Sequence, residues 1–253
     1  MTLADVKLSS QRYGSGGQIV FLHGMDGLLF ADPFLQALGK HGEVVAPECP
    51  GWGATRRQPH LRSMDDLAYP YLDLLDRIDG RVPLVGTSLG AWLAAEIATK
   101  SCAKISCLVL VAPVGLRSGE PTLRNYLDLY ASPAEEVTAA MYGSANAVPD
   151  LSLLSDADFD YLAVAQEATS YYGWEPYMHN PGLLARLHRI TVPTLVVAGD
   201  SDGFVLNDQN VKLLVDALPD AREVTLAGVG HRIEEERPDE LAELIADFVR
   251  QNS

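Results

Sequence analysis

Positive charge is scarce in this sequence. Its 253 residues include 19 Lys and Arg against 34 Asp and Glu, which gives a formal net charge of −15 with neutral histidines. Binding to nucleic acid phosphates needs clustered Lys and Arg, and an anionic membrane surface attracts the same residues. The composition therefore excludes nucleic acid as the main partner and argues against docking on a membrane.

Cysteines and long apolar runs are also few. The cysteines Cys49, Cys102 and Cys107 have no histidine at the spacing of a zinc site, which predicts free thiols in a reducing compartment. The first residues lack the basic and apolar regions of a signal peptide, and no apolar run approaches the roughly 20 residues that cross a bilayer. We therefore expect a cytoplasmic protein without a membrane span.

Apolar segments of strand length alternate with longer segments of helical period along most of the chain. The continuous apolar character of the short segments indicates strands covered on both faces, as in a parallel sheet. We predict an α/β fold with a doubly wound, mostly parallel sheet in one large domain. The expected strands are an edge strand at Val6–Tyr13 followed by Ile19–Leu22, Glu43–Pro47, Val82–Gly86, Ile105–Ala112, Thr194–Ala198 and Glu223–Leu226.

Helices are expected between these strands. Asp32 and Pro33 suit the N-cap and the first position of one helix. The acidic run at residues 234–236 is expected to be a solvated loop near the start of the last helix. The other expected helices are Asp65–Ile78, the Ala-rich Leu89–Thr99, Asn207–Leu218 and Pro238–Arg250.

Residues 117–188 break the alternation. They contain no convincing buried strand, and five prolines divide them into several short helices. Seven of the ten tyrosines lie here together with Trp174. We predict a helical cap at 117–188, inserted between core segments 1–116 and 189–253. Its aromatic residues either form the cap's own core or line a pocket.

The pattern Gly-x-Ser-x-Gly occurs twice, centred on Ser88 and Ser201. It marks a sharp strand-to-helix turn on which a nucleophilic serine is displayed. Only Ser88 runs directly into a helix, whose N-terminus stabilises negative charge. Ser201 lies between two carboxylates, which oppose a developing oxyanion. Ser88 is therefore the predicted nucleophile, and Ser201 is expected to be a turn residue.

A serine nucleophile needs a base and an acid that orients it. His231 follows a predicted strand in a glycine-rich loop, and Asp202 follows the preceding strand. Asp200 is the alternative acid, because it is only two residues away. The order Ser88, Asp202, His231 is that of an α/β-hydrolase, and all three are expected at the carboxyl ends of strands, where open α/β sheets place their sites.

The oxyanion hole needs two backbone N–H groups. Leu89, directly after the nucleophile, is expected to give one, and Met25 in the loop after the first buried strand is expected to give the other. Gly24 allows this loop to turn tightly. Asp26 is expected to be a turn residue, with the pocket mouth as the alternative.

Taken together, these motifs resemble the α/β-hydrolase superfamily. The likeness rests on His23-Gly24-x-x-Gly27, the turn at 50–53, the Ser88 elbow, the helical lid, Asp202 and His231. Ser88 stands where epoxide hydrolases and haloalkane dehalogenases have Asp. Met25 stands where cofactor-free haloperoxidases usually have Trp or Phe. Carbon–carbon hydrolases of ring-cleavage pathways are similar in size and lid, but tend to have Asn where Thr87 stands.

The resemblance implies a serine hydrolase acting on a small or medium hydrophobic ester, thioester or lactone. A carbon–carbon hydrolase of a ring-cleavage-type keto acid would use the same triad, with Arg117, Arg124 or Arg232 available for the substrate carboxylate. A third alternative is a ligand-binding protein of this fold that does not turn over its ligand.

The predicted substrate pocket lies between the elbow and the cap. No metal or organic cofactor is implied, since a serine triad is chemically complete without one. The partner is a small-molecule substrate, and the sequence does not indicate an oligomeric state. The candidate pocket residues are Gly24, Trp52, Trp92, Tyr171 and Trp174.

Overall fold

The core of the protein is one twisted sheet. A computed structural model describes residues 6–120, 122–207 and 209–252. Among these residues the strands are β1 (Ser10–Tyr13), β2 (Gln18–Leu22), β3 (Glu43–Pro47), β4 (Val82–Thr87), β5 (Ile105–Val111), β6 (Thr194–Gly199) and β7 (Ala221–Leu226). They are ordered β1-β3-β2-β4-β5-β6-β7, and each neighbouring pair is parallel except β1 with β3.

Helices cover both faces of this sheet, because alternate strand residues point to opposite faces and both sets are apolar. On one face, Val20 and Leu22 of β2 share a core cluster with residues of α2 (Met64–Asp76), α3 (Leu89–Lys100) and α6 (Gln209–Ala217). On the other face, Ile19 and Phe21 pack with α1 (Asp32–Leu38) and α8 (Pro238–Asn252). The predicted doubly wound α/β fold is confirmed.

Two local predictions at the start of the chain are wrong. Asp32 is the first residue of α1, and Ala31 is its N-cap without a side-chain bond. The Asp32 carboxylate instead accepts from Tyr13 Oη at 3.0 Å and Gln36 Nε2, so tertiary partners occupy it. Strand β1 begins at Ser10 and not at Val6, because its partner β3 ends opposite it at Pro47.

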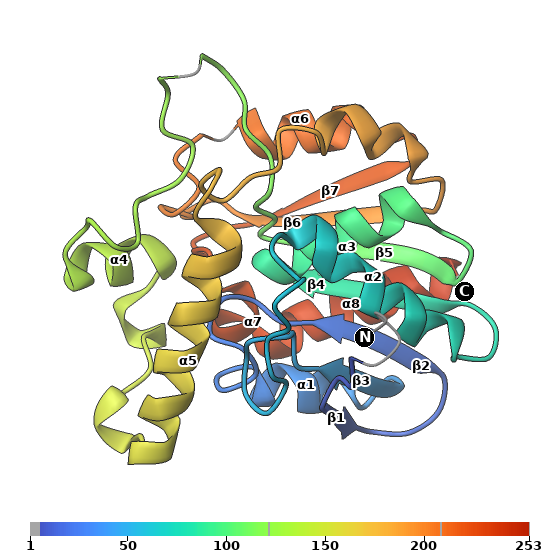
Figure 1. Ribbon diagram of the computed structural model, residues 1–253, viewed down its shortest axis with the longest axis horizontal. Coiled ribbons are helices and arrows are strands. Elements are labelled where there is room, and N and C mark those ends of the chain that lie inside the picture. Colours follow the sequence, from blue (N-terminus) through green and yellow to red (C-terminus); the bar gives the residue numbers. More distant parts are fainter. Residues whose placement is uncertain (1–5, 121, 208, 253) are drawn as a thin grey trace.

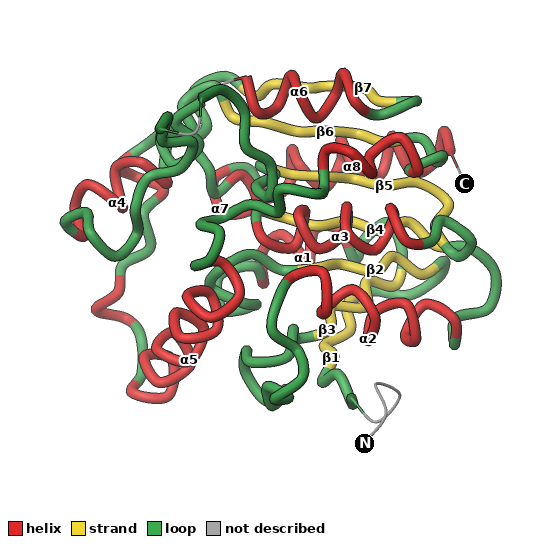
Figure 2. The backbone as a smooth tube through the Cα atoms, turned by 45° about the horizontal axis from the view of Figure 1, so that its top comes forward, coloured by secondary structure: helices red, strands yellow, loops and turns green. Residues whose placement is uncertain are grey.

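A long helical insertion separates β5 from β6. It contains α4 (Ala134–Met141), the short 3₁₀ helices η2 (Ala145–Ala147) and η3 (Leu151–Leu153), and α5 (Asp156–Gly173). Figures 1 and 2 both show α4 and α5 together at the left, beyond one end of the strands. The later 3₁₀ helix η4 (Leu184–Arg189) packs against α3 and α6 of the core. The cap division at 117 and 188 remains a prediction.

The two ends of the insertion lie side by side. Gly115 N–H donates to Met178 O, and Asn180 N–H donates to Gly115 O, each at 3.0 Å. Further out, α5 is tied to the core by Tyr161, whose hydroxyl accepts from Leu28 N–H at 3.0 Å. The insertion therefore leaves and re-enters the core at one point and also touches it elsewhere.

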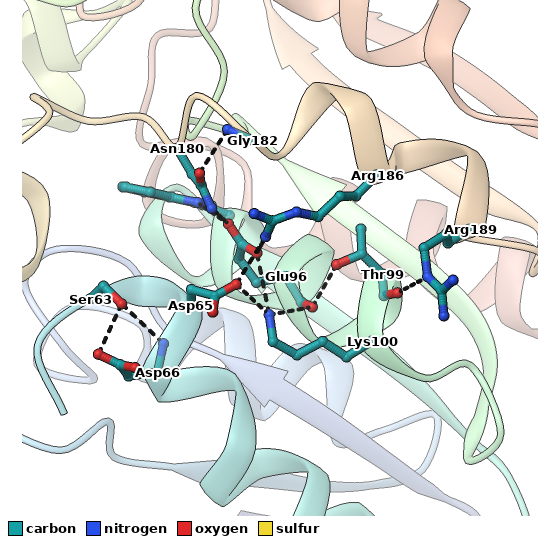
Figure 3. Close-up of polar contacts among 11 residues, drawn as sticks. Ser63, Asp65, Asp66, Glu96, Thr99, Lys100, Asn180, Gly182, Arg186 and Arg189 are labelled. Carbon is teal, nitrogen blue, oxygen red and sulfur yellow. Dashed lines mark hydrogen bonds and ion pairs between the residues drawn. The ribbon is translucent and has the colours of Figure 1, made fainter. Parts of the chain in front are cut away.

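A buried carboxylate fixes the returning end of the insertion to α3 (Figure 3). Glu96 is completely buried and accepts from Asn180 Nδ2 at 2.6 Å and from Trp92 Nε1 at 3.2 Å. A buried carboxylate without partners would be costly, so these donors hold Glu96 and Asn180 together.

Two cations extend this cluster to α2. Lys100 Nζ lies 2.7 Å from Asp65 Oδ1 and 3.5 Å from Glu96 Oε2. Arg186 Nη1 lies 3.0 Å from Asp65 Oδ1 and 3.7 Å from Glu96 Oε2. The network in Figure 3 thus joins α2, α3 and η4 through alternating charges.

The cysteines Cys49, Cys102 and Cys107 are free thiols, as the sequence predicts. No helix in the described part of the chain combines the length and apolar character needed to cross a bilayer. The described residues likewise hold no group of three or more His, Cys, Asp and Glu arranged to bind a metal ion.

Helix α3 and strand β2 approach so closely that only glycine fits between them. A Cβ atom on Gly90 would lie 2.0 Å from Leu22 O and 2.6 Å from His23 O. A Cβ on Gly86, at the end of β4, would lie 2.3 Å from Gly90 O. These contacts are with backbone atoms, which cannot rotate away.

Replacing Gly90 tests this packing. Gly90→Ala should lower the free energy of unfolding by at least about 3 kcal/mol, because the methyl group forces backbone movement in a close-packed core. Urea unfolding followed by circular dichroism measures the change. Gly17→Ala is the control, since its Cβ would meet no atom within 4 Å. Equal stability of the two variants would contradict the packing argument.

Candidate active site

Ser88 occupies a strained turn between β4 and α3. Its backbone angles are φ 51° and ψ −114°, a region that residues with a side chain rarely adopt. The turn is held from both sides, because Ser88 N–H donates to Val111 O at 2.9 Å and Ser88 O accepts from Trp92 N–H at 3.1 Å. This strained turn therefore places Ser88 Oγ at the carboxyl end of the sheet and at the N-terminus of α3.

Ser88, His231 and Asp202 form one hydrogen-bonded chain. His231 Nε2 lies 2.8 Å from Ser88 Oγ, and His231 Nδ1 lies 2.8 Å from Asp202 Oδ2. Ser88 and His231 are buried, and the Asp202 side chain is 10% exposed. With Nδ1–H donating to the carboxylate, Nε2 is the acceptor for the Ser88 hydroxyl.

The loop after β6 keeps Asp202 ionised. Asp202 Oδ1 accepts from the backbone N–H groups of Phe204 at 2.9 Å and Val205 at 3.0 Å. Burial alone would raise the pKa of Asp202, but the charge and hydrogen bond of His231, together with these N–H groups, hold the pKa below its ordinary value. Phe204 also packs edge-on against the His231 ring, with centroids 4.8 Å apart.

The alternative residues of the second Gly-x-Ser-x-Gly pattern are engaged elsewhere. Asp200 Oδ1 accepts from Gly228 N–H at 2.7 Å and from Ser201 Oγ at 2.9 Å. Both side chains lie at the exposed turn that follows β6. The structure thus joins His231 to Asp202, while Asp200 and Ser201 form a local turn.

The loop after β2 lies against the nucleophile. A Cβ on Gly24 would lie 3.3 Å from Ser88 Cβ. Gly24 O accepts from His23 Nδ1–H at 2.9 Å and from Gly27 N–H at 3.3 Å. Because the peptide is planar and trans, fixing this carbonyl also fixes the direction of the N–H of Met25.

His23 is a positioning residue, which the sequence indicates only as the first member of the motif His23-Gly24-x-x-Gly27. Its Nε2 accepts from Cys49 N–H at 2.9 Å, which requires a neutral ring with the proton on Nδ1. Burial lowers the pKa of His23 to about 4, against the opposing effect of its bond to Gly24. His23 thus joins the loop after β2 to the loop after β3.

Met25 is held by a second set of donors. Its carbonyl accepts from Trp52 Nε1 at 2.8 Å and from Thr169 Oγ1 on α5 at 3.2 Å. Trp52 is buried and stacks on Tyr172, with ring centroids 5.8 Å apart. Core and insertion together therefore set the geometry of this loop.

Helix α4 ends between the loops that carry Asp202 and His231. Its last carbonyls accept from core backbone, with Ala140 O bound by Gly203 N–H at 2.9 Å and Met141 O by Arg232 N–H at 3.1 Å. A Cβ on Gly143 would lie 2.5 Å from Gly228 O. The insertion is docked here by main-chain contacts.

The acidic run before α8 is buried and not a solvated loop. Residues 233–236 form a short helix, α7 (Ile233–Glu236), and the side chains of Glu234 and Glu236 are buried. Glu236 Oε1 accepts from Gly230 N–H at 2.6 Å and from Gly143 N–H at 3.0 Å. Glu236 therefore clamps the His231 loop to the insertion, a role that local charge pattern does not reveal.

A cavity of about 160 Å³ opens beside Met25. Its walls come from the loop after β2, from the insertion and from the residue after His231. They include Met25, Asp26, Leu129, Val137, Met141 and Arg232. Asp26 lies in a turn, as expected, and also on a wall of this cavity, as the alternative had it.

The predicted pocket aromatics lie away from this cavity, with Trp174 on the wall of a cleft of about 450 Å³ and Trp92 on the wall of one of about 300 Å³. Trp52 and Trp92 are buried and hydrogen-bonded, to Met25 O and to Glu96 respectively. Tyr171 is half-exposed beneath the Arg57 guanidinium, and Trp174 is 53% exposed. Gly24 borders Ser88. The structure brings none of the four aromatic side chains to the cavity beside Met25.

Comparison with known proteins shows the family of this chain. Residues 19–244 match the Alpha/beta hydrolase family. This chain belongs to that family. It is accordingly an α/β-hydrolase enzyme, and its fold resembles that of a thermophilic esterase from Thermogutta terrifontis, with a TM-score of 0.75 and 18% identity over 97% of this chain and 94% of the other.

Two curated α/β-hydrolase relatives differ in the reaction that their names state. A poly(3-hydroxyalkanoate) depolymerase of Ectopseudomonas oleovorans is 28% identical over 87% of this chain and 79% of its own length. A 2-hydroxy-6-oxononadienedioate/2-hydroxy-6-oxononatrienedioate hydrolase of Cupriavidus pinatubonensis is 27% identical over 81% of this chain and 75% of its own length.

Acid should unfold this α/β-hydrolase partly through His23. In the unfolded chain His23 titrates near its ordinary pKa of 6.5, and in the folded protein near 4. The unfolded state thus binds the proton first, so stability is full above pH 6.5 and falls as the pH drops toward 4, by on the order of 3 kcal/mol.

Urea unfolding at pH 7 and pH 4.5 measures this loss. His23→Gln retains an acceptor for Cys49 N–H but does not titrate, so its loss between the two pH values should be clearly smaller. His60→Gln, at an exposed position, is the matched control and should behave like the wild type. An unchanged pH dependence in His23→Gln would show that His23 does not contribute to acid unfolding.

Proposed function

We propose that this enzyme is a serine hydrolase that cleaves a small or medium hydrophobic ester, thioester or lactone through an acyl-enzyme on Ser88. One observation carries the proposal: the unbroken chain of two 2.8 Å contacts from Ser88 Oγ through His231 to Asp202. Such a chain turns a weakly nucleophilic hydroxyl into an attacking group.

The acylation step follows from these contacts. Ser88 Oγ attacks the carbonyl carbon while His231 Nε2 takes the hydroxyl proton, and Asp202 stabilises the resulting imidazolium. The carbonyl oxygen becomes an oxyanion, which the N–H groups of Leu89 and Met25 bind at the N-terminus of α3. The intermediate collapses as His231 gives its proton to the leaving alcohol, thiol or ring oxygen.

Deacylation repeats the sequence with water. His231 Nε2 removes a proton from a water molecule, which attacks the acyl carbon of the ester to Ser88. The same two N–H groups donate hydrogen bonds to the second oxyanion. Collapse breaks the bond to Ser88 Oγ, which regains its proton from His231, and the carboxylic acid is released.

The size and charge of the neighbouring cavity favour a short, uncharged acyl group. At about 160 Å³ it is smaller than the roughly 300–1,000 Å³ of pockets for drug-sized ligands. A keto acid of the ring-cleavage type is a carboxylate and needs a free cation. Arg232 at this cavity is already paired with Asp26 and Glu235, and Arg117 and Arg124 line a different cleft. These contacts favour an ester over the carbon–carbon bond of such a substrate.

A fluorophosphonate probe tests the proposed nucleophile. Peptide mapping of the wild type should find one adduct, on Ser88, because the probe mimics the tetrahedral intermediate and reacts with an activated serine. Ser88→Ala should lose the adduct and at least about 10³-fold in kcat/KM for p-nitrophenyl butyrate, while its circular dichroism spectrum stays unchanged.

The second Gly-x-Ser-x-Gly serine gives a matched control. Ser201→Ala should be labelled and should hydrolyse the ester as the wild type does, since Ser201 contacts Asp200 and not His231. Turnover that survives in Ser88→Ala would overturn the assignment. A folded wild type that neither reacts with the probe nor cleaves esters would favour the ligand-binding alternative.

A further inference from the structure

An ion pair links the turn that carries Met25 to the residue that follows His231. Arg232 Nη2 pairs with Asp26 Oδ2, and the two side chains are 9% and 24% exposed, respectively. Asp26 belongs to the loop after β2, whereas Arg232 belongs to the loop after β7, and β4, β5 and β6 lie between these strands in the sheet. The pair therefore connects the side of the expected oxyanion donor with the side of the general base.

Arg232 is held at its main chain and at its side chain. Its N–H donates to Met141 O at 3.1 Å. Its Nη1 lies 3.5 Å from Glu235 Oε1, and Glu235 Oε2 accepts from Tyr142 Oη of the insertion at 2.6 Å. Burial opposes the charge of Arg232, but the surrounding carboxylates, Asp26 first, raise the pKa of its guanidinium above the ordinary value. The guanidinium is therefore a charged anchor in a fixed place.

Met25 and Asp26 are the two central residues of one turn. Gly27 N–H donates to Gly24 O at 3.3 Å, which closes the turn. The carbonyl of Met25 is held by the core and the insertion, and the carboxylate of Asp26 is held by Arg232. Because the peptide groups are planar and the turn is closed, fixing the side chain of one central residue restricts the direction of the N–H of the other.

We propose that Asp26 and Arg232 are positioning residues, whose ion pair holds the Met25 N–H in place relative to His231 while the oxyanion forms. Neither side chain exchanges a proton or forms a bond with the substrate. Stabilisation of an oxyanion depends on donors that are already aimed at it, and a displacement of about 1 Å can cost about 100-fold in rate. This inference rests on the proposed function, because it assigns the pair to the reaction of Ser88.

Two variants of Asp26 test the pair, and both leave Arg232 its second partner, Glu235. Asp26→Asn keeps an acceptor without the charge, and Asp26→Ala keeps neither. We expect kcat and kcat/KM for p-nitrophenyl acetate to fall together, by about 5-fold in Asp26→Asn and about 50-fold in Asp26→Ala, while KM stays within about 3-fold of the wild type. Asp239→Asn, which alters an exposed ion pair with Lys40, is the control and should match the wild type. An unchanged kcat in Asp26→Ala would overturn the inference.

A transition-state analogue separates a positioning role from a merely structural one. When trifluoroacetone reacts, Ser88 Oγ forms a bond to its carbonyl carbon, the carbonyl electron pair becomes an oxyanion, and the hydroxyl proton passes to His231 Nε2. The inhibition constant of this ketone should rise by the factor by which kcat/KM falls in the Asp26 variants. Urea unfolding gives the folded fraction, by which each rate is divided. A variant that loses stability but keeps its kcat and its inhibition constant would show that the pair serves the fold alone.

The length of the acyl chain distinguishes positioning from contact with the substrate, since Asp26 and Arg232 also line the cavity beside Met25. Positioning of the Met25 N–H should lower kcat/KM for p-nitrophenyl acetate and p-nitrophenyl butyrate by the same factor. A loss confined to the butyrate would show that the pair contacts the acyl chain, and it would contradict the positioning role.

A double-mutant cycle tests whether the two residues act as one unit. The variant that combines Asp26→Ala with Arg232→Met should be no more than about 3-fold slower than the slower single variant. Losses that multiply would contradict a shared role, and the Asp26 series decides alone if Arg232→Met does not fold. If Ser88 is labelled and Asp26→Ala cleaves esters at the wild-type rate, the inference fails and the proposed function stands. If the wild type is neither labelled nor active on esters, the proposed function fails and the inference with it.

Discussion

The architecture of the site depends on the contact between two stretches of backbone, the end of β2 and the start of α3. Gly90 permits this approach, because any side chain there would meet Leu22 O and His23 O. The approach places the loop after β2 beside Ser88, whose positive φ begins the turn into α3. A distance set by main-chain atoms is stiff, and the side chains of His23, Trp52 and Thr169 then fix the orientation of the Met25 loop beside the nucleophile.

The sequence was a good guide wherever the signal is local. Period-two and helical patterns, the two glycines around Ser88 and the loops after strands predicted the sheet, its covering helices and the residues that meet as Ser88, His231 and Asp202. These features are local because each depends on residues within a few positions. Parallel order then gathers the strand ends on one edge of the sheet.

Other features depend on partners that are distant in sequence, and the sequence alone did not reveal them. Asp32 is a residue type that favours helix N-caps, yet its carboxylate accepts hydrogen bonds from Tyr13 and Gln36 instead. The acidic run at 234–236 looks solvated until Gly230, Gly143 and Arg232 are brought against it. Tyr171 and Trp174 of the insertion are exposed and lie away from the cavity beside Met25, because their place depends on how the insertion packs on the core and not on a local sequence pattern.

The docking of α4 has a consequence for how this enzyme can change. The helix is attached through Ala140 O and Met141 O, which are main-chain atoms present whatever the side chain. Substitutions at Val137 or Met141 therefore alter the wall of the cavity without removing the bonds that hold it over His231. Attachment and the shape of the cavity wall thus depend on different atoms of the same helix. The side chains of this wall can consequently change one at a time while the helix stays bound to the loops that carry Asp202 and His231.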